Sequence, residues 1–376
     1  MKLTDYVTMG RSGLRVSPVC LGTMTFGNEE WGSDENTSRA IFDRYLEAGG
    51  NFLDTADLYA GGKSEELLAK FIGERGMRDR VVIATKFTFN GDPGNPNAGG
   101  NGRKNIYRAL EDSLRRLKTD YVDLYYQHVW DIVTPVEEVV ETLTELVREG
   151  KIRYYGFSDT PAWYVARAQT IAEKEGKSRA IALQLEYSLV ERNIEREHIP
   201  AAQELGIGIC PWSPLAAGFL SGKYKREGNS GQGGGLLEKA RTIGGPVFDK
   251  FTDKNWTILN AVEGVAKQIG KSPAQVALSW IATQPGVTST ILGARGLAQF
   301  EENLAGFEFT IPDELREKLD DASALPEAHP YMFFGETLQS RVNGGTTIEP
   351  WKPARIYKGT SAASEPAKTK ASGATK

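Results

Sequence analysis

The stretch Asn51-Phe-Leu-Asp-Thr-Ala-Asp-Leu-Tyr59 carries the strongest structural signal in this chain of 376 residues. Residues 51–56 predict a short buried strand, and Tyr59 follows in the loop before a helix expected to begin near Ser64. A carboxylate near a strand end, here Asp54, and a phenol in the next loop are how a barrel of parallel strands presents an acid and its partner. Read alone, the same residues could form a strand end that caps a helix.

Short apolar runs alternate with amphipathic stretches over most of the chain, which favours β-α units and a parallel sheet. The strand candidates are residues 16–22, 51–56, 81–86, 121–128, 152–158, 182–187, 207–212 and 289–293. Helical periodicity is found at residues 35–48, 64–73, 104–117, 135–148, 161–173, 197–205, 256–269 and 273–282. Eight such units predict an α/β fold of the (β/α)8 TIM barrel type, with a doubly wound sheet as the alternative.

The segments outside these units extend one predicted domain, residues 1–357. Residues 6–16 are expected to form an N-terminal β-hairpin on the floor of a barrel at 16–309, and residues 310–357 a C-terminal helix (312–322) and long extension that packs on the barrel. Residues 358–376 have the composition of a disordered tail. The Gly- and Asn-rich loops at 91–102 and 228–245 follow the third and seventh strands, so both are expected at the mouth of the barrel.

Charge and composition give no reason to expect nucleic acid or a membrane as partner. The formal charge of −4 comes from 45 basic and 49 acidic residues. No apolar run approaches the roughly 20 residues that cross a bilayer, and the first residues lack an apolar targeting region. Cys20 and Cys210 lie in apolar strand candidates, which favours reduced core thiols. A cytoplasmic protein is therefore expected, and its oligomeric state is left open.

Two more ionisable residues close apolar strands. Lys86 ends Val81-Val-Ile-Ala-Thr-Lys86, and His128 ends the fourth strand candidate. Burying such a group without a partner is costly. Because parallel strands of a barrel end at the same face, Asp54, Lys86 and His128 are expected to meet there, with Tyr59 one loop away. Each has an ordinary alternative, as a helix cap, a solvent-facing lysine, a core histidine or an exposed loop tyrosine.

These residue types suit the reduction of a carbonyl, which needs hydride at carbon and a proton at oxygen. A phenol with a pKa of about 10 is a weak acid at neutral pH, but a nearby ammonium stabilises the phenolate. Tyr59 is thus predicted to be the general acid, with Lys86 and Asp54 as the pair that tunes it. His128 is predicted to donate a hydrogen bond to the carbonyl oxygen.

Several common cofactor motifs are missing from the sequence. No G-x-G-x-x-G follows a strand candidate, so a Rossmann dinucleotide site is not supported. The chain has three histidines, and they are too scattered to give metal-ligand spacing. A nicotinamide would therefore be bound without these motifs, by the last strands of the barrel.

These features resemble the aldo-keto reductases, NADPH-dependent carbonyl reductases with an Asp, a Tyr, a Lys and a His at the active centre. The resemblance covers roughly residues 6–309, and the run Tyr126-Gln-His-Val-Trp-Asp131 is closest to the aryl-alcohol dehydrogenase-like branch. It implies the catalytic roles given above and a reversible reduction of an aldehyde or ketone to the alcohol. Aromatic or otherwise bulky carbonyls are the implied substrates.

The resemblance also implies an NADPH/NADP+ site. The matching positions are Gly22, Thr23, Met24, Asp54, Ser158, Asp159, Gln184, Trp212, Ser213, Pro214, Leu215, Gly218, Lys223, Gly293, Arg295, Gln299, Glu302 and Asn303. In the family pattern Trp212 would stack on nicotinamide and Arg295 would meet the 2′-phosphate, which favours NADPH over NADH. Asp159 departs from the pattern, because many members have Asn there, and a carboxylate accepts hydrogen bonds but does not donate them.

Aromatic residues near the strand ends suggest an apolar substrate pocket, with Trp31, Phe87, Phe89 and Trp130 at its rim. Two other functions stay open. The Trp212-Ser-Pro-Leu215 segment and the following Ser221-Gly-Lys223 also resemble the aldo-keto-reductase-like β subunits of potassium channels, which would make the chain a nicotinamide-binding regulatory subunit. A lyase or isomerase barrel that binds no nucleotide is the third possibility.

Overall fold

The computed structural model describes residues 1–227, 230–232, 237 and 248–348. The chain divides into two compact units, Met1–Ser323 and Ala324–Lys376. Within the described part of the second unit, a short 3-10 helix, η7 (Tyr331–Phe334), precedes α12 (Glu336–Val342). Whether residues 310–357 as a whole pack on the barrel, as predicted, stays a prediction, and the predicted tail at 358–376 lies outside the described residues.

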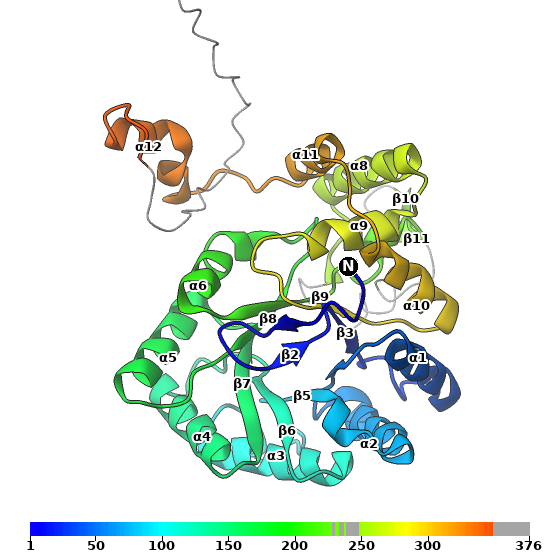
Figure 1. Ribbon diagram of the computed structural model, residues 1–376, viewed down its shortest axis with the longest axis vertical. Coiled ribbons are helices and arrows are strands. Elements are labelled where there is room, and N and C mark those ends of the chain that lie inside the picture. Colours follow the sequence, from blue (N-terminus) through cyan, green and yellow to red (C-terminus); the bar gives the residue numbers. More distant parts are fainter. Residues whose placement is uncertain (228–229, 233–236, 238–247, 349–376) are drawn as a thin grey trace, which may run out of the picture. The chain divides into compact units, whose positions relative to one another are not determined.

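Eight parallel strands form the core of the first unit and run in the order β12-β3-β4-β5-β6-β7-β8-β9 (Figure 1). They are β3 (Val19–Gly22), β4 (Phe52–Asp54), β5 (Val82–Phe87), β6 (Val122–Gln127), β7 (Ile152–Ser158), β8 (Ala182–Glu186), β9 (Gly208–Trp212) and β12 (Thr290–Leu292). A parallel bridge between Ile209 and Val287 joins the two ends of this order. The predicted TIM barrel is confirmed, and all eight strand candidates are strands.

Side chains alternate across each strand, so every second residue points into the barrel. On β5, Val82 and Ala84 belong to the inner apolar cluster, whereas Ile83 and Phe87 belong to the cluster between sheet and helices. Lys86 therefore points inward, at the carboxyl end of its strand. The same alternation on the other strands gives this end of the barrel its functional side chains.

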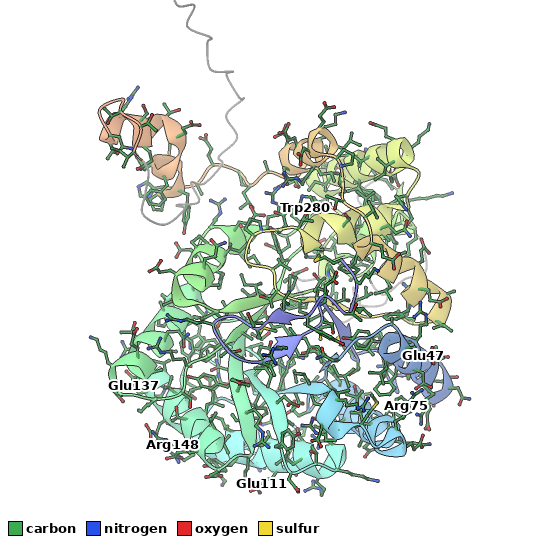
Figure 2. The ribbon with its side chains drawn as sticks, in the orientation of Figure 1. Glu47, Arg75, Glu111, Glu137, Arg148 and Trp280 are labelled. Atoms are coloured by element: carbon green, nitrogen blue, oxygen red, sulfur yellow. The ribbon has the colours of Figure 1, made fainter. Side chains whose placement is uncertain are left out.

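Helices surround the sheet and present charged side chains outward, such as those labelled on α4 in Figure 2. They are α1 (Glu35–Glu47), α2 (Lys63–Arg75), α3 (Arg103–Leu117), α4 (Val136–Arg148), α5 (Ala162–Lys174), α6 (His198–Leu205), α8 (Asp253–Ile269), α9 (Pro273–Ala282), α10 (Leu297–Leu304) and α11 (Asp313–Ala322). Trp280 of α9 is fully buried and donates from Nε1 to Asp320 Oδ1 at 2.8 Å, which fastens α11 to the barrel. None of the helices in the described residues has the length and apolar character needed to cross a membrane.

The predicted hairpin is present as β1 (Val7–Thr8) paired with β2 (Arg15–Val16). Its turn lies against the start of β9, because Gly10 has a φ of +54° and a Cβ there would stand 2.6 Å from Gly206 O. The buried Met9 reaches the inner cluster, where its sulfur lies 3.8 Å from Cys210 Sγ. The hairpin therefore closes the amino-terminal end of the barrel and leaves the opposite end open.

Some elements differ from their predicted form. Helix α10 was not predicted as a helix, although Leu297, Phe300 and Leu304 follow helical spacing. Pro135 and Pro161 are N-caps and precede the first helical turn by one residue. In the long loop after β9, β10 (Lys225–Glu227) and β11 (Ser230–Gln232) form an antiparallel pair, and most of the predicted 228–245 loop lies outside the described residues.

Candidate active site

A buried ion pair lies at the open end of the barrel. Lys86 is fully buried, and its Nζ donates to Asp54 Oδ1 at 2.6 Å and to the carbonyl oxygen of Thr55 at 2.7 Å. Gln184 of β8 donates from Nε2 to the other oxygen of Asp54 at 2.7 Å. The pair is thus hydrogen-bonded on both sides, which a buried charge pair requires.

Tyr59 completes this group from the loop after β4. Lys86 Nζ lies 3.3 Å from Tyr59 Oη and 4.8 Å from the centre of its ring. Three consecutive left-handed residues follow, Ala60, Gly61 and Gly62, with φ values of 47°, 63° and 93°. The φ of Gly62 favours glycine, and a Cβ there would also stand 2.6 Å from Arg116 Cδ, so that this side chain would have to shift. The turn brings the phenol back over the strand ends.

The pKa of Tyr59 is raised overall, although the prediction had the Lys86 ammonium stabilising the phenolate. Burial raises the pKa of Tyr59, and the adjacent Lys86 ammonium opposes that rise without cancelling it. Burial disfavours the charge on Lys86 and is the largest single effect on its pKa, but Asp54 and Tyr59 together outweigh it and raise that pKa. The phenol is therefore held protonated beside a permanent cation. A proton donor needs the first property, and the phenolate that it leaves needs the second.

His128 lies one residue beyond β6, on the other side of Tyr59. The centres of the two rings are 6.0 Å apart and their planes meet at 77°. Burial, with a smaller contribution from Lys86, lowers the pKa of His128, so the imidazole is neutral at pH 7. Its Nδ1 atom is buried and has no hydrogen-bond partner among the described residues. The ring can therefore serve a ligand as a neutral hydrogen-bonding group.

The predicted rim residues do not all lie at the mouth. Phe89 is exposed and stands edge-on to the His128 ring, with centres 4.9 Å apart. Trp130 is partly exposed and packs on Trp163 of α5 at 5.4 Å. Trp31 is partly buried in the loop after β3. Phe87 does not belong to this group, because it is fully buried toward the helices, against the Tyr125 ring at 4.9 Å.

Predicted cofactor residues of β7, β8 and β9 converge beside the ion pair. Ser158 and Gln184 are partners in the sheet register, and both are buried. The exposed Asp159 has a left-handed φ of 40° and accepts a hydrogen bond from Trp212 Nε1 at 3.2 Å. Partial desolvation in the mouth raises the pKa of Asp159 to about 6. The carboxyl group is thus fixed next to the indole ring that was predicted to stack on nicotinamide.

The predicted residues after β3 have different surroundings. Gly22 is the inward residue at the end of its strand, and a Cβ there would stand 2.7 Å from Ile291 Cγ2. Thr23 is buried, and its hydroxyl is engaged with the carbonyl oxygen of Asp54 and with Ser64. Met24 is 41% exposed. Only Met24 of the three has a side chain open to a ligand.

The loop after β9 has a backbone conformation that lets a ligand come close to its main chain. Ser213, Ala216 and Ala217 have left-handed φ values, and Ser213 Oγ accepts from the amide of Ala217 at 2.9 Å. Within this loop Pro214 is buried and Leu215 is partly buried. A Cβ on Gly218 would stand 3.0 Å from Lys223 Nζ, so the lysine folds across this glycine. Such a turn with a cation beside it suits an anionic pyrophosphate.

The predicted adenosine residues lie on and before α10. Arg295 and Gln299 are exposed, and the amide of Arg295 donates to Gln299 Oε1 at 3.0 Å. Asn303 is buried, and its Nδ2 has no hydrogen-bond partner in the described part of the chain. Gly293 and Glu302 are exposed at the same edge. An exposed planar cation just before α10 and an amide without a partner on α10 fit a phosphorylated nucleoside.

A second polar cluster lies behind the site and was not predicted. Glu65 is fully buried and accepts hydrogen bonds from Thr85 Oγ1 and Arg116 Nε, both at 2.6 Å. Asp57 faces it with a buried Oδ1 that has no partner among the described residues. Burial, with the Glu65 charge second, raises the pKa of Asp57 to about 7. No local pattern in the sequence marks this cluster, because its members come from separate elements: Glu65 from α2, Thr85 from β5, Arg116 from α3 and Asp57 from the segment after β4.

A family model described as Aldo/keto reductase family matches residues 18–324. The chain belongs to this family. Among similar proteins, this aldo/keto reductase is 36% identical to the uncharacterized oxidoreductase YrpG of Bacillus subtilis, over 87% of this chain and 100% of that protein. It is 33% identical to the aryl-alcohol dehydrogenase [NADP(+)] of Phanerodontia chrysosporium, over 86% of this chain and 87% of that protein. It is 34% identical to a probable voltage-gated potassium channel subunit beta of Oryza sativa, over 87% of this chain and 98% of that protein.

Family membership and the oxidoreductase relatives make this chain an oxidoreductase, and they support carbonyl reduction as its class of reaction. The predicted resemblance to the aryl-alcohol dehydrogenase-like branch is confirmed by relatives of that name. The aldo/keto reductase barrel also confirms the predicted fold.

Proposed function

We propose that this protein reduces an aldehyde or ketone to the alcohol with NADPH, and that Tyr59 is the general acid. The observation that carries the proposal is the contact of a fully buried Lys86 ammonium with both Asp54 Oδ1 at 2.6 Å and Tyr59 Oη at 3.3 Å. A bound reduced nicotinamide would supply the hydride. The residues of the chain would orient the carbonyl and supply the proton to its oxygen.

Each residue then has a defined task. Tyr59 gives its proton to the carbonyl oxygen, and Lys86 stabilises the phenolate that remains. Asp54 keeps Lys86 charged inside the barrel, where burial alone would favour loss of its proton. His128, as a neutral imidazole, donates a hydrogen bond that holds the carbonyl oxygen toward Tyr59. In the reverse reaction Tyr59 takes the proton back.

The residues that would hold the cofactor fit its parts. Asp159, Ser158 and Gln184 would meet the carboxamide, and the Trp212 ring the nicotinamide face. The loop from Ser213 to Gly218, with Lys223, would hold the pyrophosphate. Arg295 would pair with the 2′-phosphate, and Asn303 Nδ2 would donate a hydrogen bond to adenine. The named cofactor of the Phanerodontia relative supports NADP(H) for this chain.

Aromatic or bulky carbonyls are the proposed substrates, because the exposed Phe89 ring stands against His128 and offers apolar surface there. The Phanerodontia relative, an aryl-alcohol dehydrogenase by name, supports the same class. The test is NADPH oxidation, followed at 340 nm, against a panel of aromatic, sugar and steroid-like carbonyls. Turnover of aryl aldehydes is expected, and no NADPH-dependent turnover of any of them would contradict the proposal.

A second function is a nicotinamide-binding regulatory or channel-associated subunit with little catalytic role. The similarity to the rice protein named as a channel subunit supports this second candidate function. Such a protein would bind NADPH and turn over carbonyls slowly. Tight binding without turnover across the whole panel would favour this function over the enzyme.

A further inference from the structure

The loop that carries Phe89 is held in an unusual backbone conformation. Thr88 joins β5 to this loop and has a φ of 122°, a region that a β-branched residue rarely adopts. Residues in such conformations are strained and persist where their surroundings hold them, often at functional sites. Here the surroundings are specific hydrogen bonds.

One buried amide supplies the central bonds. Asn101 is fully buried; its Oδ1 accepts from Thr88 Oγ1 at 2.7 Å, and its Nδ2 donates to the carbonyl oxygen of Val129 at 3.0 Å. It thereby links the segment after β5 to the segment after β6. Only a side chain that both accepts and donates can make this link.

The same bonds position His128. The amide of His128 donates to Thr88 Oγ1 at 3.2 Å and to the carbonyl oxygen of Phe87 at 3.0 Å. The backbone N–H of Asn101 donates to Asp131 Oδ2 at 2.7 Å, so this side chain also holds the loop in place. The Thr88 hydroxyl therefore contacts both Asn101 and the backbone of the candidate hydrogen-bond donor.

The consequence is the contact between Phe89 and His128. Their ring planes meet at 85° with centres 4.9 Å apart, although Phe89 is 44% exposed and could otherwise turn to solvent. His128 meets Tyr59 in a similar edge-on manner at 77°. The three rings form one wall that runs outward from the proton donor.

We propose that Thr88 and Asn101 are positioning residues that hold Phe89 against His128, and that this wall selects flat aromatic carbonyls over small aliphatic ones. The selection rests on the proposed function. The positioning does not, because it concerns only the arrangement of the two rings. A flat substrate would gain the Phe89 surface as it brings its carbonyl oxygen to Tyr59 and His128, and a small aldehyde would not reach it.

The positioning is tested by NMR of protein labelled with 13C-histidine, in which the chain's three histidines give few ring signals. Phe89→Leu removes the aromatic ring current and identifies the His128 signal by its shift. Thr88→Val keeps the shape but loses the hydroxyl, so its His128 signal is expected to move toward that of Phe89→Leu. Thr88→Ser keeps the hydroxyl and is the matched control, with a signal near the native position. A native His128 signal in Thr88→Val would overturn the positioning.

The selection is tested by the ratio of kcat/KM for benzaldehyde to kcat/KM for propanal. In Phe89→Leu and in Thr88→Val this ratio is expected to fall about tenfold, as loss of one aromatic contact or one hydrogen bond implies. The exposed position of Phe89 keeps this arm informative if Thr88→Val folds poorly. Turnover with an unchanged ratio in Phe89→Leu would overturn the inference alone. No turnover by the native protein would overturn the proposed function, and the selection with it.

Discussion

Lys86 is fully buried, and its ammonium lies 2.6 Å from Asp54 Oδ1 at the end of the neighbouring strand. The pair joins stability to chemistry, because the charge that would stabilise a phenolate on Tyr59 exists only while Asp54 balances it. Gln184 holds the second oxygen of Asp54, so the carboxylate cannot turn away. Changes at either partner should therefore affect both folding and catalysis.

Lys86→Met should lower the free energy of unfolding by about 3–5 kcal/mol, because it leaves Asp54 buried without its cation. Lys86→Met combined with Asp54→Asn removes both charges and should recover a large part of that loss. Urea unfolding of the native protein, both single variants and the double variant measures the coupling. Additive losses in the double variant would mean that the two side chains do not act as a pair.

The buried carboxyl of Asp57 should make stability fall as pH rises. Its pKa goes from 3.8 to about 7 in the folded chain, so the native state loses stability between about pH 4 and pH 7 as this group ionises. Asp57→Asn removes the ionisation. It should be close to the native protein at pH 5 and more stable by about 1–3 kcal/mol at pH 8.5. Urea unfolding at both pH values checks this. If the free energies of unfolding of the variant and the native protein differed equally at pH 5 and pH 8.5, a titration at Asp57 would be excluded.

Asp159 should affect the two redox forms of the cofactor differently. Its carboxylate lies by Trp212 and favours the cationic oxidised nicotinamide, so Asp159→Asn at pH 8 should weaken NADP+ relative to NADPH about fivefold. At pH 5 the difference should shrink, because a carboxyl with a pKa of about 6 is then protonated. Calorimetric Kd values for both forms give the ratio, in which titration of the 2′-phosphate cancels. The same ratio in both proteins at pH 8 would rule out this effect.

Arg295→Ala should weaken NADPH binding about 10- to 100-fold and leave NADH binding almost unchanged, because only NADPH carries the 2′-phosphate. Arg295→Lys keeps the charge but not the planar fork, so its affinity for NADPH should lie between that of the native protein and that of Arg295→Ala. The Kd values of both nucleotides, measured by fluorescence quenching, make the comparison. Equal losses for NADPH and NADH would show that Arg295 does not meet a phosphate.

The fold and the catalytic group could be predicted because both follow from local patterns. Apolar runs of strand length set the eight strands, and parallel strands bring their ends to one face. Asp54, Lys86 and His128 were thus placed together without knowledge of any long-range contact. Tyr59 was added by its short distance along the chain from Asp54.

The misplaced and missed residues have a common physical cause. Phe87 was expected at the rim, but β5 continues one residue past Lys86, and the next side chain of a strand points to the opposite face. Asn101 lies in a Gly- and Asn-rich loop, where nothing local marks the residue that becomes buried. Glu65 and Arg116 meet only because α2 and α3 pack side by side. Contacts of this kind depend on the assembled barrel.

The central claim is that Tyr59 donates the proton, and Tyr59→Phe tests it most directly, since the variant keeps the ring and removes only the hydroxyl. We expect kcat for an aryl aldehyde to fall by at least about 100-fold, the usual scale of general acid catalysis. The Kd for NADPH, measured on the same samples by fluorescence quenching, should stay within about threefold of the native value, a difference of well under 1 kcal/mol. A variant that binds NADPH normally and reduces the aldehyde at the native rate would contradict the account.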